Sequence, residues 1–303
     1  MNSLVNIFAN NLLPILFAAS AGYALRRTLK VEVRPLGIAT FYVFTPALVF
    51  KILTETQLAF GDLLRMIGFA GFIILAIAGI AFALARALRL PSGLTSALVL
   101  ASAFMNSGNY GLSLNLLAFG EAGLAWASLY YITSSVLVFS LGIWTAAAGK
   151  TSSLKALAGL LKAPVVYAAP LAFLFRSTGF ALPPPVWRAV ELLSSAAVPA
   201  LLVLLGMQIA TTRRLTNLSL IAACVGLRLL LSPLLAWLAS PLFGLTPLGT
   251  SVAILESAMP TAMMTAVIAL EYEAQSEFVA SAVLVSTLLS PLTVTPLLLL
   301  LGA

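Results

Sequence analysis

The sequence predicts an all-α membrane protein, and three observations support this fold class. First, 61% of the 303 residues are hydrophobic and only 8% are charged, whereas soluble proteins carry about 25% charged residues. Second, the mean hydropathy is +1.10. Third, apolar runs of roughly 20 residues, the length of a helix that spans the hydrocarbon core, recur along the whole chain. These runs do not alternate as the strands of a membrane β-barrel would.

Charged residues and clusters of proline or glycine divide the chain into ten candidate transmembrane helices. These lie near 5–25, 36–53, 63–88, 93–119, 122–148, 156–177, 184–210, 217–243, 247–270 and 276–301. We refer to them as predicted helices 1 to 10. We expect a single transmembrane domain over 1–303, with its midpoint in the loop "GKTSSLK" at 149–155.

Composition excludes several classes of chemistry. The chain has no histidine and one cysteine, Cys224, so His-based zinc sites, Ser-His-Asp triads, haem ligation by histidine and an intrachain disulfide are ruled out. We expect no enzyme activity and no cofactor, because the sequence also lacks paired intramembrane aspartates. The formal net charge of +7 comes mainly from Lys and Arg beside the apolar runs. We therefore expect a lipid bilayer, and no nucleic acid, as the partner.

The distribution of basic residues predicts the orientation, because cytoplasmic loops carry an excess of Lys and Arg. One side of the bundle holds eleven bases and the other holds four. The eleven are Arg26, Arg27, Lys30, Arg34, Arg86, Arg89, Lys150, Lys155, Lys162, Arg213 and Arg214. The four are Lys51, Arg65, Arg176 and Arg188. We expect the midpoint loop in the cytoplasm and both termini outside, and the short loops favour a bacterial inner membrane.

The two halves of the chain resemble each other. The stretch "TPALVFKIL" (45–53) matches "VPALLVLLG" (198–206), which aligns Pro46 with Pro199. The stretch "TSALVLASAFMNSG" (95–108) matches "TSVAILESAMPTAM" (250–263) at nearly the same offset. This pattern predicts two repeats, 1–148 and 156–303, of five helices each. An odd number of helices inverts the second repeat, and inverted repeats are typical of secondary transporters.

Predicted helix 4 carries polar residues where they cost most. In "AFMNSGNYGLSL" (103–114), Asn106 is about 20 Å into the span at 1.5 Å per residue. Asn, Gly108 and Gly111 all weaken a helix. An unwound turn here can line a polar cavity, where half-helix N-termini bind anions and C-termini bind cations. Close helix packing through small residues is the alternative, but packing does not account for Asn106 and Asn109.

Predicted helix 9 contains Glu256 about 13 Å into the span, and an intramembrane acid is a functional candidate. It can carry a proton or coordinate Na⁺. The alternative is a structural ion pair with Arg228 near the middle of predicted helix 8, which can itself attract an anion. Pro260 removes a backbone hydrogen bond and should break the helix beside the acid. Pro46 and Pro199 predict paired kinks in helices 2 and 7.

Four motifs in order resemble those of the auxin efflux carrier family, in its bacterial branch, over essentially the whole chain. The first is "YVFTPALVF" in helix 2. An N-x-G…G-x-P-L pattern falls on Asn106, Gly108, Gly111 and Leu114. An E-x-x-M-P pattern falls on Glu256, Met259 and Pro260, and an S-T-x-x-S pattern on Ser286, Thr287 and Ser290. Ser113 replaces the family's proline in helix 4, so we expect the break there to depend on Gly108, Asn109 and Gly111.

The resemblance implies a fold similar to bile acid–sodium symporters, with helices 4 and 9 broken and crossing. Helices 1, 2, 6 and 7 would form a scaffold, through which we also expect a homodimer. Helices 3, 4, 5, 8, 9 and 10 would form a transport domain that moves like an elevator. Family substrates are organic acids such as malonate, malate or auxin. By analogy with the symporters, Glu256 would bind Na⁺.

These observations lead to the hypothesis of a secondary transporter that couples a small organic anion to H⁺ or Na⁺. The expected substrate contacts are Asn106, Ser107, Gly108, Asn109, Met259, Pro260, Thr261 and Arg228. The expected cation-coupling residues are Glu256, Asn109 and Thr287. A receptor or lipid-sensing module without transport and a cation/proton antiporter of the same fold are the alternatives, and a membrane-embedded enzyme is a third.

Overall fold

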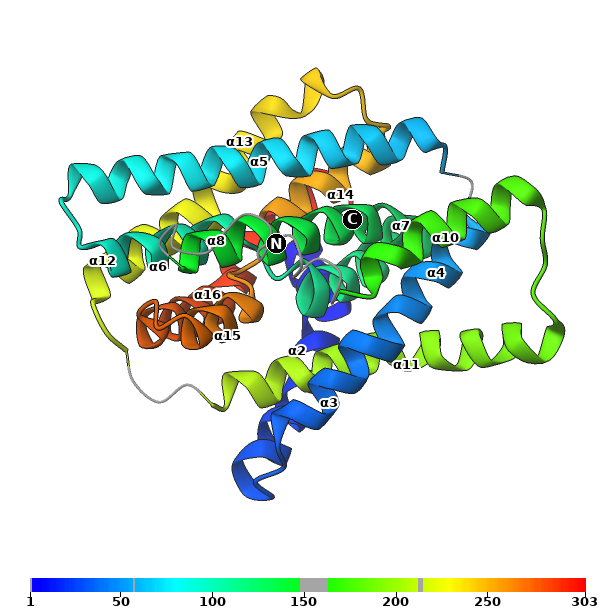
Figure 1. Cartoon of the computed structure of the whole chain (residues 1–303), viewed down its shortest axis with the longest axis horizontal. Coiled ribbons are helices and arrows are strands. Elements are labelled where there is room, and N and C mark those ends of the chain that lie inside the picture. The colour runs from blue at the N-terminus through cyan, green and yellow to red at the C-terminus, as the bar shows by residue number, and fades with distance from the viewer. Residues whose placement is uncertain (1, 57, 148–162, 212–214) are drawn as a thin grey trace.

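The computed structural model describes residues 2–56, 58–147, 163–211 and 215–303 (Figure 1). Within these ranges the chain is helical, and the only pairing of extended backbone is one isolated bridge. Seven of the described helices are long and apolar enough to cross a membrane, and two shorter apolar helices cover Ser92–Ala103 and Val165–Thr178. The prediction of an all-α membrane protein is therefore confirmed for the described residues, while the count of ten helices stays a prediction.

The described residues from 2 to 147 form twelve elements, in which η marks a π-helical turn. They are α1 (Asn2–Ile7), η1 (Phe8–Leu12), α2 (Leu13–Thr28), α3 (Val33–Ala39), η2 (Thr40–Phe44), α4 (Thr45–Glu55), α5 (Phe60–Ala87), α6 (Ser92–Ala103), η3 (Ser107–Leu112), α7 (Ser113–Leu137), η4 (Val138–Gly142) and α8 (Ile143–Ala146). Gly120 interrupts α7 with a φ of 66°, where the sequence predicts the loop between helices 4 and 5.

The second half contains the remaining described elements, of which η6 is a 3-10 turn. They are α10 (Val165–Thr178), α11 (Pro184–Ile209), α12 (Leu218–Gly226), η5 (Leu227–Leu231), α13 (Ser232–Ala239), η6 (Ser240–Leu242), α14 (Pro247–Ser257), α15 (Met263–Glu271) and α16 (Ser276–Leu301). The midpoint loop 149–155 and the start of predicted helix 6 lie outside the described residues, as do five of the bases that predict the orientation. Those bases are Lys150, Lys155, Lys162, Arg213 and Arg214.

The helices pack in two groups. In the first, α11 contacts α2, α3 and α4, and α4 contacts α10. In the second, α5 contacts α6 and α7, α14 contacts α7, and α16 contacts α12 and α15. Figure 1 shows α6 and α15 in the left half of the molecule and α7 and α14 in the right half. The two helices that precede the breaks, α6 and α14, therefore approach the centre from opposite ends.

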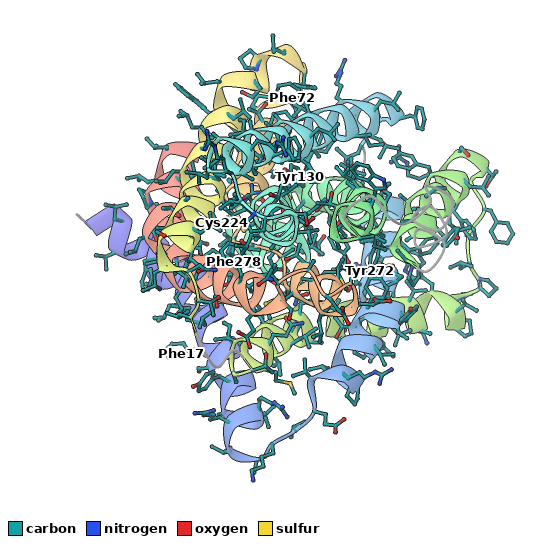
Figure 2. All side chains as sticks on the ribbon, turned by 60° about the vertical axis from the view of Figure 1, so that its left-hand side comes forward. Phe17, Phe72, Tyr130, Cys224, Tyr272 and Phe278 are labelled. Atoms are coloured by element: carbon teal, nitrogen blue, oxygen red, sulfur yellow. The ribbon has the colours of Figure 1, made fainter. Side chains whose placement is uncertain are left out.

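Large apolar side chains cover the outside of the bundle. Leu242, Leu292 and Leu300 are 80%, 73% and 82% exposed. Figure 2 shows Phe17 and Phe72 pointing outward, whereas Tyr130 and Cys224 lie inside. A soluble protein does not expose so much contiguous apolar surface, so hydrocarbon is the solvent that suits this exterior.

The prolines that were expected to kink helices occupy different positions in their helices. Pro46 is the second residue of α4 and follows the π-helical turn η2. Pro199 lies inside α11. Pro260 lies between α14 and α15, where regular helix stops. A proline removes one backbone donor at each position, and only at Pro260 does the chain leave the helix altogether.

Candidate functional site

The first helix break lies at the centre of the molecule. Helix α6 ends at Ala103, and Phe104 has extended backbone angles of φ −103° and ψ 120°. Regular structure resumes at Ser107. The side chain of Asn106 accepts a 3.2 Å hydrogen bond from the backbone N–H of Asn109, as an N-cap residue does. Asn106 therefore begins the second half-helix.

This position corrects the expectation that Gly108, Asn109 and Gly111 make the break. All three lie inside the π-helical turn η3, beyond residues 104–106, where the regular helix is interrupted. Ser113, in place of the family's proline, simply continues the helix with φ −65° and ψ −44°. The break does not need the proline because its backbone finds partners in a second break.

The second break covers the residues between α14 and α15 and contacts the first. Met105 and Thr261 form an antiparallel bridge. The N–H of Asn106 donates to Pro260 O at 2.7 Å, and the N–H of Ala262 donates to Phe104 O at 2.9 Å. Unpaired backbone is not tolerated inside a membrane, and here each break supplies the other's hydrogen bonds. Residues from the two halves of the chain thus form one crossing.

Side chains reinforce the crossing around Thr261. Its hydroxyl donates to the carbonyl oxygen of Ala101 at 2.8 Å, and its N–H donates to the hydroxyl of Ser286 at 3.1 Å. Met259, Pro260 and Thr261 are buried in the crossing. These three predicted substrate contacts do not line the adjacent cavity.

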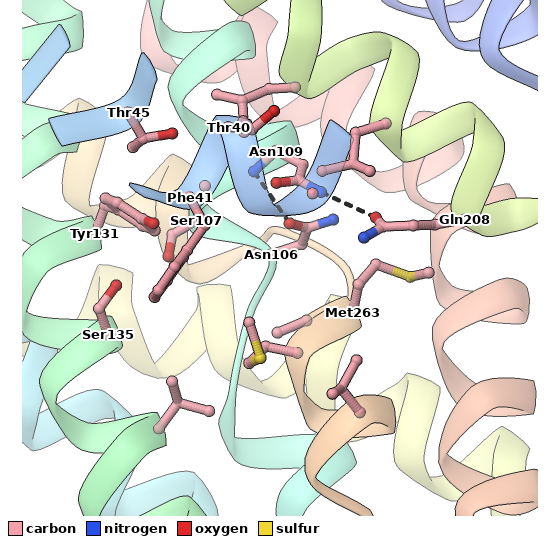
Figure 3. Close-up of a pocket in the computed structure, with 18 of the residues that line it drawn as sticks. Thr40, Phe41, Thr45, Asn106, Ser107, Asn109, Tyr131, Ser135, Gln208 and Met263 are labelled. Carbon is pink, nitrogen blue, oxygen red and sulfur yellow. Dashed lines mark hydrogen bonds between the residues drawn. The ribbon is translucent and has the colours of Figure 1, made fainter. Parts of the chain in front are cut away.

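A cavity of about 500 Å³ adjoins the crossing. Its lining includes four predicted substrate contacts, Asn106, Ser107, Gly108 and Asn109. The opposite wall comes from α3, η2, α4 and α11. Further polar lining residues that the sequence did not single out are Thr40, Thr45, Tyr131, Ser134 and Ser135. Figure 3 shows the side chains of Asn106, Asn109, Gln208 and Met263 grouped around this space.

The asparagine side chains that line the cavity differ in whether their amide nitrogens have hydrogen-bond partners. Asn109 Nδ2 donates to Gln208 Oε1 at 2.9 Å, which joins η3 to α11 (Figure 3). Asn106 is 5% exposed, and its Nδ2 has no hydrogen-bond partner among the described residues. A buried donor without a partner costs about 1–3 kcal/mol, so Asn106 is ready for an acceptor such as a carboxylate.

The electrostatics of the cavity favour an anion. The first residues of η3 and of α15 line it, and helix N-termini carry partial positive charge. Arg34 is the only charged residue in the described lining. The sequence placed Arg34 among the juxtamembrane bases, and only the folded chain brings it to the cavity. No acidic side chain opposes an anion there.

Glu256 lies behind the crossing, outside the cavity lining. Its side chain is completely buried, and Oε1 accepts a 2.8 Å hydrogen bond from Asn115 Nδ2. Oε2 has no partner. The carboxylate lies against Gly111, where an added Cβ would come within 2.4 Å of Oε2. The sequence did not single out Asn115. Thr287 was predicted to take part in cation coupling with Glu256. Its hydroxyl instead donates to the carbonyl oxygen of Val283 in its own helix at 2.7 Å.

Arg228 is also completely buried, and it does not line the cavity. Its Nη1 donates to the carbonyl oxygens of Ser102 and Ala103 at 2.9 and 3.1 Å. Its Nη2 donates to the carbonyl oxygen of Ser257 at 2.5 Å. The two ion pairs of the described residues are Lys51–Glu55 and Arg65–Asp62, so the alternative of an Arg228–Glu256 pair is wrong.

Comparisons with known proteins find transporters. A family model described as a membrane transport protein matches residues 150–298. An "Uncharacterized transporter" of Methanothermobacter thermautotrophicus is 36% identical over 214 residues, which are 70% of each chain. A relative in Methanocaldococcus jannaschii, also named as an uncharacterized transporter, is 30% identical over 65% of each chain. A "Putative malonate transporter" of Rhizobium meliloti is 28% identical over 94% of this chain and 93% of the relative.

Proposed function

Because the chain belongs to the membrane transport protein family, which is that of the auxin efflux carriers, we propose that it is a secondary active transporter of a small organic anion. The substrate class is a carboxylate such as malonate, malate or an auxin-like acid. Malonate is the first compound to test, since a relative that aligns over 94% of this chain carries that substrate in its name.

One observation carries the anion assignment. Two half-helix N-termini and the unpartnered Nδ2 of Asn106 meet at a cavity without acidic lining residues. In this proposal the carboxylate accepts hydrogen bonds from Asn106 and from backbone N–H groups of Ser107 and Gly108. Asn109 and Gln208 complete the polar wall, and Arg34 draws the anion toward the cavity. Pro260, Met259 and Thr261 hold the crossing in shape beneath it.

The two packing groups support a mechanism of alternating access. The scaffold is the group of α2, α3, α4, α10 and α11, and the transport domain contains the crossing. An elevator-like shift of one group against the other would expose the cavity to each side in turn. The Asn109–Gln208 hydrogen bond links the two groups and would have to break during that shift. We further propose that the scaffold mediates a homodimer.

The arrangement of ten helices as two inverted repeats, 1–148 and 156–303, belongs to the same proposal. Its support is that the breaks fall in matching stretches of the two halves, and that α6 and α14 approach the centre from opposite ends (Figure 1). The proposed setting is a bacterial inner membrane with both termini outside, for which the excess of bases on one side is the reason.

Glu256 is the proposed coupling residue, through H⁺ or Na⁺. Its Oε2 has no partner, and a buried carboxylate oxygen in that condition favours uptake of a cation or a proton. Coupling requires that the cation and the substrate favour the same conformations. Since Glu256 lies next to Gly111 of η3, a change in its charge would act directly on the half-helix that begins at Asn106.

Uptake of radiolabelled malonate into proteoliposomes tests the proposal. We expect accumulation driven by an imposed pH or Na⁺ gradient, competition by malate, and no uptake in protein-free vesicles. Saturable malonate binding without flux would instead indicate a receptor. Gradient-driven exchange of Na⁺ for H⁺ without any dependence on carboxylates would indicate an antiporter. Either result would overturn the transport of organic anions.

A further inference from the structure

Arg228 has the largest side chain among the fully buried described residues. It lies in the π-helical turn η5, near the middle of the apolar span Leu218–Leu242. All nine acidic residues of the chain lie within the described ranges, and none of them forms an ion pair with Arg228. A cation in the middle of a membrane protein without a carboxylate partner needs another source of negative charge.

That source is a pair of helix C-termini. The guanidinium donates to the carbonyl oxygens of Ser102 and Ala103 at the end of α6. It also donates to the carbonyl oxygen of Ser257, the last residue of α14. The last four carbonyls of a helix lack partners within the helix and together carry about half a negative charge. Two such ends therefore balance one guanidinium.

Neighbouring side chains hold the guanidinium in place. Ser232 accepts a short hydrogen bond from Arg228 Nη2, and its hydroxyl donates to the carbonyl oxygen of Ser257 at 2.8 Å. Tyr130 and Ser257 share a hydrogen bond of 3.1 Å between their hydroxyls. At the C-terminal end of α6, the hydroxyl of Ser102 donates to the sulfur of Cys224 at 3.3 Å. The guanidinium is thus fixed between α6 and α14.

We propose that Arg228 is a built-in counter-ion that positions the crossing. It supplies, from the chain itself, the positive charge that two converging half-helix C-termini would otherwise take from a bound cation. Arg228 is then a positioning residue and not a substrate ligand, and these carbonyl ends are not a Na⁺ site. Only one consequence of this inference rests on the proposed transport function, namely that any coupling cation must act at Glu256.

The planar fork of arginine is what this role requires. Its two Nη atoms reach carbonyls on different helices at once, whereas a lysine ammonium is a single point donor. Arg228→Lys should therefore keep the charge but bridge the two ends less well. Arg228→Gln should lose both the charge and the bridge between the two helix ends. Arg176 provides a matched control because its Nη1 also donates to a carbonyl of another segment, that of Thr56 at 2.9 Å, far from the crossing.

A disulfide across the crossing measures its geometry without any substrate. Met105 and Thr261 face each other in an antiparallel bridge, and such pairs have Cα atoms about 4.5–5.5 Å apart, which suits a disulfide. In a Cys224→Ala background, Met105→Cys with Thr261→Cys should oxidise readily with copper phenanthroline. The readout is the loss of free thiols after denaturation, with the linked peptides identified by mass spectrometry.

Adding Arg228→Gln to this pair should slow cross-linking at least about tenfold, which corresponds to about 1.4 kcal/mol, while Arg176→Gln should leave the rate unchanged. Cross-linking at the parent rate in a folded Arg228→Gln protein would overturn the positioning role. If that variant does not fold, Arg228→Lys decides the matter. A cross-linking rate below that of the matched Arg176→Lys variant supports the positioning role of the planar guanidinium of Arg228. An equal rate overturns that role.

Thermal unfolding separates the counter-ion role from coupling. Glu256→Gln removes the other buried charge, so the carbonyl ends are then the remaining candidate for a buried Na⁺ site among the described residues. With Arg228 intact we expect no shift in Tm when NaCl replaces choline chloride at constant ionic strength. A stabilisation by Na⁺ in this variant would overturn the built-in counter-ion. Both assays are independent of flux, so a failure of malonate transport would count against the proposed function alone.

Discussion

Asn115 donates from Nδ2 to Oε1 of Glu256 across 2.8 Å, and the same nitrogen donates to the carbonyl oxygen of Gly111 at 2.9 Å. Because both partners are acceptors, the amide nitrogen must face them, and the amide oxygen of Asn115 faces away. Within the described ranges, that oxygen and Oε2 of Glu256 have no hydrogen-bond partners. The pair therefore holds Glu256 by one oxygen and leaves the other for a proton or a cation.

Glu256→Gln should abolish accumulation driven by a pH or Na⁺ gradient and should preserve exchange of labelled for unlabelled substrate. Glutamine keeps the size of the side chain and an oxygen that accepts from Asn115, but it cannot change its charge. Exchange and gradient-driven uptake are measured in the same proteoliposomes. Glu271→Gln, an exposed change at the end of α15, is the control and should keep both activities. Full gradient dependence in Glu256→Gln would place coupling elsewhere.

Gly111→Ala should destabilise the protein by about 1–3 kcal/mol, the usual cost of overpacking. Its new Cβ would lie 2.4 and 2.5 Å from the carboxylate oxygens of Glu256. Thermal unfolding in detergent measures the loss. Gly79→Ala in α5 is the matched control, because nothing lies within 4 Å of its Cβ position and alanine favours a helix.

The cause of that destabilisation can be checked by a double substitution. Glu256→Ala removes the atoms that the new methyl group meets, so Gly111→Ala should cost much less in that background. Contacting residues are expected to be non-additive in this way. Additive effects would mean that the strain from Gly111→Ala arises against some other neighbour.

Local sequence predicted the parts of the site that depend on local chemistry. The concentration of Asn and Gly near Asn106, and the proline at Pro260, indicated two breaks at the positions of helices 4 and 9. Glu256 and Arg228 stood out because a charge inside an apolar run is costly. Each of these signals lies within a few residues of the feature that it predicts.

Contacts between distant residues could not be read in the same way. Asn115 and Glu256 are 141 residues apart, and Asn109 and Gln208 are 99 apart. No periodicity relates such positions, so the sequence offered a pairing of Arg228 with Glu256 where the fold pairs Arg228 with carbonyls. The expected break at Gly108 and Gly111 was wrong for a related reason. The residue at which each of these two helices ends depends on which backbone groups of the other break lie opposite it.

Asn106→Asp and Asn106→Ala should separate helix capping from substrate binding. Aspartate still accepts from the N–H of Asn109 and is as good an N-cap, but it replaces the free Nδ2 donor with a negative oxygen. Alanine loses the cap and the donor together. We expect Asn106→Asp to be nearly as stable as the parent, and to bind malonate more weakly than Asn106→Ala does. Isothermal titration calorimetry and thermal unfolding measure the two quantities.

The size of the effect on binding follows from the hydrogen bond that is removed. A hydrogen bond to a charged group is worth about 1.5–3 kcal/mol, so Asn106→Ala should raise Kd at least about tenfold. Asn217→Asp makes the same chemical change at an exposed helix start away from the cavity, and it should leave Kd unaltered. Parent-like malonate binding by Asn106→Asp would show that the carboxylate does not lie at Asn106.

Helices α2 and α11 approach so closely that two glycines meet the opposite backbone. A Cβ on Gly206 would lie 1.7 Å from the carbonyl oxygen of Ala19, and a Cβ on Gly22 would lie 1.9 Å from that of Val203. Glycine at such a contact lets two membrane helices pack backbone to backbone. Neither obstacle is a side-chain tip that can turn aside, so any larger residue must push the helices apart.

Gly22→Ala and Gly206→Ala should therefore each lower stability by about 3 kcal/mol, whereas Gly226→Ala in α12, with open space at its Cβ position, should not. The double variant should be much less than additive, because one methyl group already separates the helices and makes room for the second. Denaturation of the purified protein in increasing SDS, followed by circular dichroism, measures the stability of these four variants relative to the parent. Strictly additive losses would mean that the two glycines do not share one helix contact.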